Sequence, residues 1–436
     1  MEKPNLIVKH GLKYILVFLS VICLSLGTLV LSAMIPQWAI KENVRESAEY
    51  LCKGELFGEV IKDVEGSRID RYADSILLAI AYQYDSEAPL TSVMRSAYYH
   101  SELHNENENL LAAVTHDYDA NQQYLRYWHG SNVIWRPLLT ILNLEHIYIL
   151  IGGLIALLAI SLLIILTREK AYFPAVGVTA GLVMTSVWFV PFSLEYTWTY
   201  LWMFVLSIVG VKLMLRKQYG AVGCFFLISG MLTAFGDFLT TETLTLTVPL
   251  LLMLWMDRTK NGRKNVRDSI RTTGKAVTAW GLGYVGMWGM KWLIASLVLS
   301  ENVMPYVSGH MAERVGGDLE IGFLQYISGA IQRNIKCLFP FEYGILGALT
   351  GVALVLLAIY IGYVYHEDSI DWKYIFLLTM IGVVPYIRYA VLLNHSYLHY
   401  FFTYRAQMGT ILAIVLLLDQ VTDGMRMLWA KKDRKR

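Results

Sequence analysis

The stretch EHIYILIGGLIALLAISLLIIL, residues 145–166, decides the fold class. After Glu145 and His146 it carries no acidic or basic residue, and a helix of this length crosses roughly 30 Å of hydrocarbon. Nine further apolar segments lie at about 14–36, 172–192, 199–215, 220–236, 243–256, 276–298, 344–365, 374–393 and 406–428. We therefore predict an all-α polytopic membrane protein with about ten transmembrane helices in a single membrane domain, 1–436.

The composition supports this class. Of the 436 residues, 56% are hydrophobic and 17% are charged, against about 45–50% and 25% in soluble proteins. The mean hydropathy is +0.44. These values exclude disordered, collagen-like and disulfide-scaffold proteins. The chain has no P-loop, GxGxxG, HExxH or CxxC motif, which argues against an ATP-driven pump and a recognisable metalloprotease.

Basic residues are concentrated at alternate ends of the segments, as the positive-inside rule describes. The 257–275 loop holds seven Lys or Arg against two Asp. Others flank the first, second, fourth and last segments: Lys3, Lys9, Lys13, Arg168, Lys170, Arg216, Lys217, Lys431, Lys432, Arg434, Lys435 and Arg436. Glu367, Asp368 and Asp371 break the pattern, but acidic residues carry little topological weight. We expect a multi-pass protein of the plasma (inner) membrane with both termini in the cytoplasm.

Two long segments then lie outside the membrane, a first extracytoplasmic loop at 37–144 and a second at 299–343. Residues 37–136 hold 16 Asp or Glu and 9 Lys or Arg, so the first loop is net acidic. It is too long to be a simple connection. Ile76, Leu77, Ile80 and Ala81 recur at helical spacing, which predicts short helices within it. Cys52 and Cys337 both fall outside, where a disulfide is an option but not a requirement.

The first loop contains the acidic candidates. Asp70 and Asp74 are four residues apart and share one helix face. Such a pair suits a divalent metal, a shared proton or a general base. The alternative is the solvated first turn of an amphipathic helix, with Arg71 as a partner.

Two other acidic residues, Glu42 and Asp237, can likewise be interpreted either as site residues or as structural residues. Glu42 shares a face with Glu46 and Glu49, and Arg45 is spaced to pair with Glu49, which favours a solvated helix face. Asp237 lies between two apolar segments, where a carboxylate is a functional candidate. It is equally suited to cap the sixth segment.

Basic residues and histidines also gather near the expected outer membrane level. Lys291, Arg388, Arg405 and Arg136 each suit a snorkelling anchor, but together they indicate a site for an anionic lipid headgroup. His395 and His399 share a helix face and could ligate a metal, bind a phosphate or carry a proton. The alternative is that they, like His129, are polar members of an interfacial aromatic belt.

This layout resembles the GT-C superfamily of membrane glycosyltransferases, which use sugars carried on polyprenyl phosphates. The stretches YWHGSNVIWRPLL (127–139), GDFLTTET (236–243) and NHSYLHYFFTYR (394–405) look like those of bacterial membrane proteins grouped with this superfamily. The resemblance implies a long first outer loop with an acidic catalytic base or metal ligand. It also implies basic residues that bind the carrier phosphate.

The resemblance predicts transfer of a sugar from a polyprenyl-phosphate carrier to a cell-envelope polymer or glycolipid at the outer face. Asp74 is the leading candidate for the base that activates the acceptor hydroxyl, with Asp70 and Glu42 as alternatives, and a divalent metal on Asp70 and Asp74 is a candidate cofactor. The carrier phosphate would lie near Lys291, Arg388 and Arg405. Membrane lipid is an expected partner and nucleic acid is not. The alternatives are an envelope polysaccharide polymerase or ligase, and a lipid-linked sugar transporter or flippase.

Overall fold

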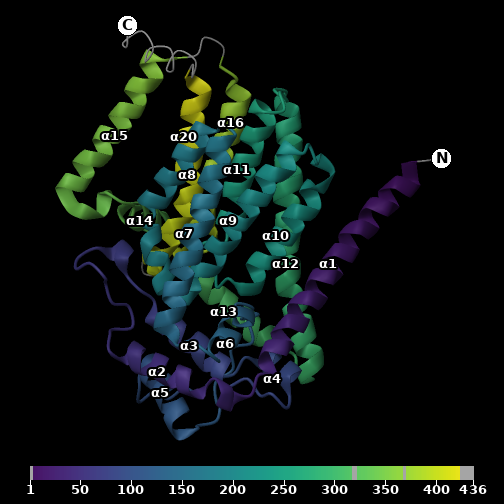
Figure 1. Ribbon diagram of the computed structural model, residues 1–436, viewed down its shortest axis with the longest axis vertical. Coiled ribbons are helices and arrows are strands. Elements are labelled where there is room, and N and C mark those ends of the chain that lie inside the picture. Colours follow the sequence, from purple (N-terminus) through teal and green to yellow (C-terminus); the bar gives the residue numbers. More distant parts are fainter. Residues whose placement is uncertain (1–2, 317–321, 367–369, 423–436) are drawn as a thin grey trace.

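A computed structural model describes residues 3–316, 322–366 and 370–422 (Figure 1). Within these ranges the chain forms twenty α-helices joined by short turns of 3₁₀ helix. The described residues contain isolated β-bridges, such as Tyr98 with Gln122, but no strand. The predicted all-α class is therefore confirmed.

Among the residues that the structure describes, eight helical segments are long and apolar enough to cross a membrane. They are Gly11–Ala33, Leu144–Arg168, Leu194–Leu215, Tyr219–Gly236, Val266–Leu299, Phe341–Val364, Trp372–Val391 and Tyr400–Val421. The predicted segments at 172–192 and 243–256 correspond to shorter helices, α8 (Tyr172–Met184) and α11 (Leu244–Thr259). Beyond α8 the chain turns at Ser186, whose φ is +51°, into a 3₁₀ helix, η3 (Val187–Phe192).

The bundle consists of α7 (Leu144–Arg168), α9 (Leu194–Leu215), α10 (Val222–Gly236), α12 (Val266–Leu299), α16 (Trp372–Gly382) and α20 (Met408–Val421), with α8 and α11 (Figure 1). α1 (Lys3–Ala33) leans against it and α15 (Gly344–Val364) stands apart. The basic tail beyond Thr422, with Glu367 and Asp368, lies outside the described residues. Glycines allow α10 and α12 to touch, because a Cβ on Gly230 would lie 2.0 Å from the Trp280 carbonyl oxygen.

The predicted first loop folds at one end of the bundle (Figure 1). Its helices are α2 (Lys41–Cys52), α3 (Arg71–Tyr82), α4 (Pro89–Arg95), α5 (Glu106–His116) and α6 (Asn132–Leu138). The predicted helix face of Ile76, Leu77, Ile80 and Ala81 belongs to α3 and is buried. α3 packs on α5 and α9, so the loop is part of one core with the bundle.

The predicted second loop holds α13 (Met304–Val315) and α14 (Phe323–Lys336). The short helices α17 (Val384–Val391), α18 (Leu393–Leu398) and α19 (Tyr400–Thr403) follow α16. Cys52 and Cys337 are both free thiols, so the optional disulfide does not form. Cys337 is buried beside Tyr404 and Ile411, whereas Cys52 is exposed.

Candidate functional site

A small cavity lies between the first loop and the bundle. Its walls come from the start of α3, residues 124–129, the start of α9, the end of α13, and residues 395–402. It encloses about 60 Å³ of space accessible to water, which is room for a few water molecules. Phe238 also lines the cavity, so six distant parts of the chain converge on it.

Two carboxyl groups face each other in this cavity. Asp70 caps α3 and accepts a hydrogen bond from the Ala73 amide at 2.8 Å. Burial raises the pKa of Asp70 to about 6, although hydrogen bonds from Ala73 and from the Glu195 side chain oppose the rise. Oε2 of Glu195 is buried and has no partner among the described residues. Two neighbouring carboxyl groups avoid carrying two charges by sharing one proton. Because Oε2 of Glu195 is buried without a partner, it is a candidate for a contact with a ligand.

Three histidines line the same cavity. Burial lowers the pKa of His129 to about 3 and that of His399 to about 4. Burial also lowers the pKa of His395 well below its usual value. All three are therefore neutral near pH 7. The rings of His395 and His399 lie 4.8 Å apart between centroids, so the predicted shared face is observed.

Aromatic rings and one cation complete the walls. The rings belong to Tyr72, Tyr124, Tyr127, Phe238 and Phe402. Arg314 reaches the cavity from the end of α13. Apolar walls with a few convergent polar groups are typical of small-molecule sites.

Asp74 lies outside this cavity, although it is one turn from Asp70. Its carboxylate is fully buried and accepts hydrogen bonds from the Tyr148 hydroxyl, the Ser193 hydroxyl at 3.0 Å and the Leu194 amide at 2.8 Å. Both of its oxygens thus hold α3 against α7 and the start of α9. The structure gives Asp74 no open position for a substrate.

The four predicted phosphate-binding cations do not converge on one site. Lys291 donates to the Val93 and Met94 carbonyls at 2.9 and 3.0 Å, at the end of α4. Arg136 donates to the Ile35 and Tyr84 carbonyls at 2.6 and 3.1 Å. Arg405 donates to the Gly66 and Phe401 carbonyls at 3.1 and 3.2 Å. With Asp74, Lys291 and Arg405 hold the first loop against the bundle, whereas Arg136 joins parts of the loop to each other and to the end of α1.

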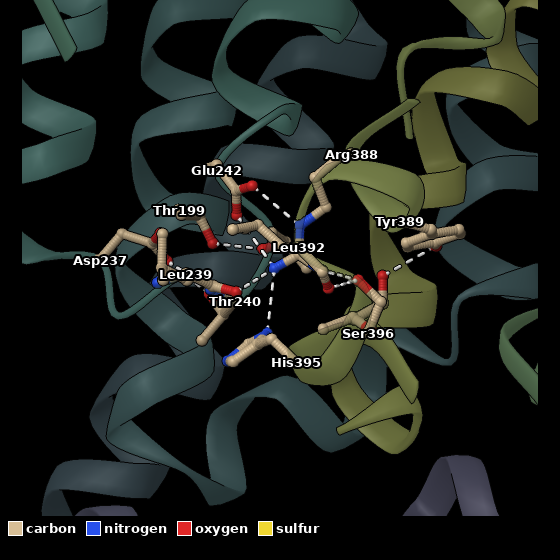
Figure 2. A network of polar contacts seen from close by, with 12 residues as sticks. Thr199, Asp237, Leu239, Thr240, Glu242, Arg388, Tyr389, Leu392, His395 and Ser396 are labelled. Carbon is tan, nitrogen blue, oxygen red and sulfur yellow. Dashed lines mark hydrogen bonds and ion pairs between the residues drawn. The ribbon is translucent and has the colours of Figure 1, made fainter. Parts of the chain in front are cut away.

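Arg388 is paired within the protein (Figure 2). Its Nε lies 2.8 Å from Oε1 of Glu242, and its guanidinium also donates to the Ser396 hydroxyl at 2.9 Å and to the Leu239 carbonyl. The same guanidinium approaches Nδ1 of His395 at 3.4 Å. Arg388 is thus neutralised by Glu242 and lies behind a cavity residue.

The other acidic candidates also have local partners. Asp237 accepts hydrogen bonds from the Leu239 amide at 2.9 Å and from the Thr240 amide at 3.2 Å, so it caps the turn before α11. Burial and the charge of Glu242 raise the pKa of Asp237 to about 7. Glu42 is exposed on α2 and paired with Arg45, away from the cavity. Arg45 also pairs with Glu49, as the spacing predicts.

The described residues hold no group of three or more His, Cys, Asp or Glu that could bind a metal ion. Asp70 and Asp74 do not form a joint metal site, because the carboxylate of Asp74 already accepts hydrogen bonds from three donors. This donor set does not fit a divalent ion on that pair.

A separate groove begins on the other side of residues 69–71. Its polar part, about 740 Å³, is lined by Arg71, Lys62 and Arg68, while Arg68 is engaged by Glu59 and Glu65. Arg71 makes no side-chain hydrogen bond or ion pair with another described residue. Tyr50 and Phe192 connect this part to an apolar groove of about 590 Å³ between α7 and η3.

Sequence reasoning did not single out Glu195, Arg314 or the groove residue Arg71 as site residues. Glu195 is an acidic residue between two apolar segments, which is a functional signal in a membrane protein. The signals for Arg314 and Arg71 are weak, since each lies in a polar stretch with other charges. Comparisons with protein-family models, curated proteins and solved structures found no match.

Proposed function

We propose that the protein is a membrane glycosyltransferase that moves a sugar from a polyprenyl-phosphate carrier to a cell-envelope polymer or glycolipid. The observation that carries this proposal is the buried Asp70–Glu195 carboxyl pair, which lines a cavity with aromatic walls and in which Oε2 of Glu195 has no partner among the described residues. A base with a pKa of about 6 is matched to proton transfer near neutral pH. Glycosyl transfer needs such a base and a site shielded from water.

In the proposed reaction, a hydroxyl oxygen of the acceptor attacks the anomeric carbon of the sugar. The bond from that carbon to the carrier phosphate breaks, and polyprenyl phosphate leaves with the bonding electrons. Asp70 takes the hydroxyl proton, while Glu195 keeps its own proton and holds Asp70 in place. A single displacement of this kind inverts the anomeric configuration.

The groove beyond residues 69–71 supports a lipid-linked donor. The apolar part suits a hydrocarbon chain, because Ile149 and Trp188 on its walls are 73% and 42% exposed on the bundle's outer surface. The polar part offers Arg71, whose guanidinium suits phosphate. Ile69 and Arg71 line the groove, whereas Asp70, Tyr72 and Ala73 line the cavity, so one short segment borders both.

For the cellular setting, we propose the plasma membrane, with the cavity at the outer face and both termini in the cytoplasm. The concentration of basic residues in the 257–275 loop supports this orientation. The eight long apolar helices support a multi-pass arrangement.

The test is transfer by the purified protein in liposomes supplied with a labelled polyprenyl-phosphate sugar and an extract of envelope glycan. Asp70→Asn should lower transfer by about 10²–10⁴-fold, the range for a lost general base. Glu169→Gln, a change of the same kind at the half-buried residue that caps the end of α7, is the control and should keep wild-type transfer. Movement of intact lipid-linked sugar across the bilayer without release of polyprenyl phosphate would favour a flippase.

The donor site is tested by direct binding of polyprenyl phosphate to the same protein. Arg71→Gln should weaken binding by roughly tenfold to hundredfold, because a charge-assisted hydrogen bond contributes about 1.5–3 kcal/mol. Arg168→Gln, at the end of α7, serves as the arginine control. Unchanged binding in Arg71→Gln would remove this groove from the proposal.

A further inference from the structure

Each histidine of the cavity is held by a group whose hydrogen-bonding role is fixed. A guanidinium has only donors, so any imidazole nitrogen that faces it must accept. NH2 of Arg388 faces Nδ1 of His395 at 3.4 Å, and the pair of Arg388 with Glu242 holds the guanidinium in place (Figure 2). The proton of neutral His395 must therefore be on Nε2.

The second histidine is held in the opposite way. NH1 of Arg314 faces Nε2 of His399 at 3.4 Å, so the proton of His399 is on Nδ1. Phe402 stacks on the His399 ring with centroids 5.3 Å apart and an angle of 22° between the planes, which limits rotation of the ring. No hydrogen bond among the described residues reaches Nε2 of His395 or Nδ1 of His399.

The third histidine supplies an acceptor. Nε2 of His129 lies 3.0 Å from the Tyr124 carbonyl and must donate to it. Nδ1 of His129 then carries a lone pair, and it is buried without a partner. The residues that line the cavity thus carry two N–H donors, on His395 and His399, one acceptor, on His129, and a carboxyl pair with one proton.

We propose that Arg314 and Arg388 are positioning residues that set opposite tautomers in His399 and His395, so that the cavity, which has room for a few water molecules, takes one or two hydroxyl groups of an uncharged sugar ring and not a phosphate. Hydroxyls both donate and accept, which matches this mixed wall. A phosphate offers oxygen acceptors to a wall that already contains a carboxylate and a bare imidazole nitrogen. This inference rests on the proposed glycosyl transfer and identifies which part of the donor the cavity holds.

The test of the tautomers needs no activity. The full chain, with ¹⁵N in the rings of its 10 histidines, is observed by NMR in lipid near pH 7, and signals are assigned with His395→Asn, His399→Asn and His129→Asn. We expect Nε2–H for His395 and the less common Nδ1–H for His399. Arg314→Met should release His399 from the Nδ1–H form, and Arg314→Lys, which retains a donor, should restore it. A wild-type His399 in the Nε2–H form overturns the proposal.

Recognition is tested on the same signals by titration with a panel of methyl pyranosides and, separately, with inorganic phosphate. At least one pyranoside should shift His395 and His399, and phosphate should shift neither. His146, which is exposed and bonded to Asn143 at 2.7 Å, should not respond to either. A phosphate response, or no response to any pyranoside, overturns the recognition. Opposite tautomers with a pyranoside response but no transfer in liposomes would instead refute the glycosyltransferase and leave a sugar-binding site.

Discussion

Two regions of the molecule use buried polar side chains in opposite ways. At the loop–bundle interface, Asp74, Lys291 and Arg405 all form hydrogen bonds with distant parts of the chain. Around the cavity, Oε2 of Glu195 and Nδ1 of His129 are buried without a partner. Buried polar atoms are almost always satisfied in folded proteins. Nε of Arg405 is also without a partner, but the rest of that guanidinium is held by carbonyls at a packed contact. Only the unpartnered atoms of residues that line the cavity are therefore candidates for ligand contacts.

The largest effect on stability should follow from Asp74→Ala. The change leaves the Tyr148 and Ser193 hydroxyls and the Leu194 amide without their acceptor. We expect a loss of about 3–5 kcal/mol in the free energy of unfolding, as when one member of a buried charged network is removed. Thermal unfolding in detergent measures it, with the exposed Asp119→Ala as the control. A variant as stable as wild type would mean that Asp74 does not hold the loop.

Arg405→Ala should have the next largest effect, again on folding. Its guanidinium lies 4.6 Å from the Tyr196 ring and 4.9 Å from the Tyr404 ring, and it holds Gly66 of the first loop. Removing this fully buried side chain should cost about 2–4 kcal/mol of stability.

The carrier-binding role predicted from the sequence gives the opposite result for Arg405→Ala. Polyprenyl-phosphate binding per folded molecule should stay near wild type if the residue belongs to the loop–bundle interface. If Arg405→Ala loses polyprenyl-phosphate binding while its unfolding temperature is unchanged, Arg405 belongs to the donor site.

A smaller effect, with a distinctive pH dependence, is expected for Asp70→Asn. Burial raises the pKa of Asp70 from 3.8 to about 6, so the folded state holds the proton more tightly than the unfolded state. This tighter binding of the proton stabilises the folded state fully below pH 3.8, and the stabilisation is lost as the pH rises through about 6. Asp70→Asn has no such loss, so it should gain about 1–3 kcal/mol on wild type across this range. A stability difference that does not change with pH would contradict the buried, proton-sharing carboxyl.

The sequence was informative where local pattern determines structure. Long apolar runs indicate membrane helices, and the spacing of Ile76, Leu77, Ile80 and Ala81 predicts α3, because both follow from the chain alone. His395 and His399 were expected on one face, and their rings lie 4.8 Å apart. The short α8 and α11 were harder to predict, since apolar composition alone does not reveal where a helix breaks.

The sequence was uninformative about the partners of the charged residues, which depend on tertiary contacts. Arg388 pairs with Glu242, which is 146 positions away in the chain, and Lys291 reaches carbonyls of α4 that are 197 and 198 positions away. Nothing in their local sequence distinguishes such a contact from a phosphate site. Asp70 and Asp74 are likewise distinguished only by their tertiary contacts, because Asp74 is bonded to α7 and the start of α9 whereas Asp70 lines the cavity.

The most direct test of the account compares transfer by Asp70→Asn and Asp74→Asn, each expressed per folded molecule in liposomes. Both changes remove a carboxylate from the same turn of α3 and keep its size. The account predicts that Asp70→Asn lowers transfer by about 10²–10⁴-fold, the contribution of a general base. Folded Asp74→Asn should retain transfer within about tenfold of wild type, because Asp74 only holds the loop. Full activity in Asp70→Asn with an inactive, folded Asp74→Asn would contradict the account.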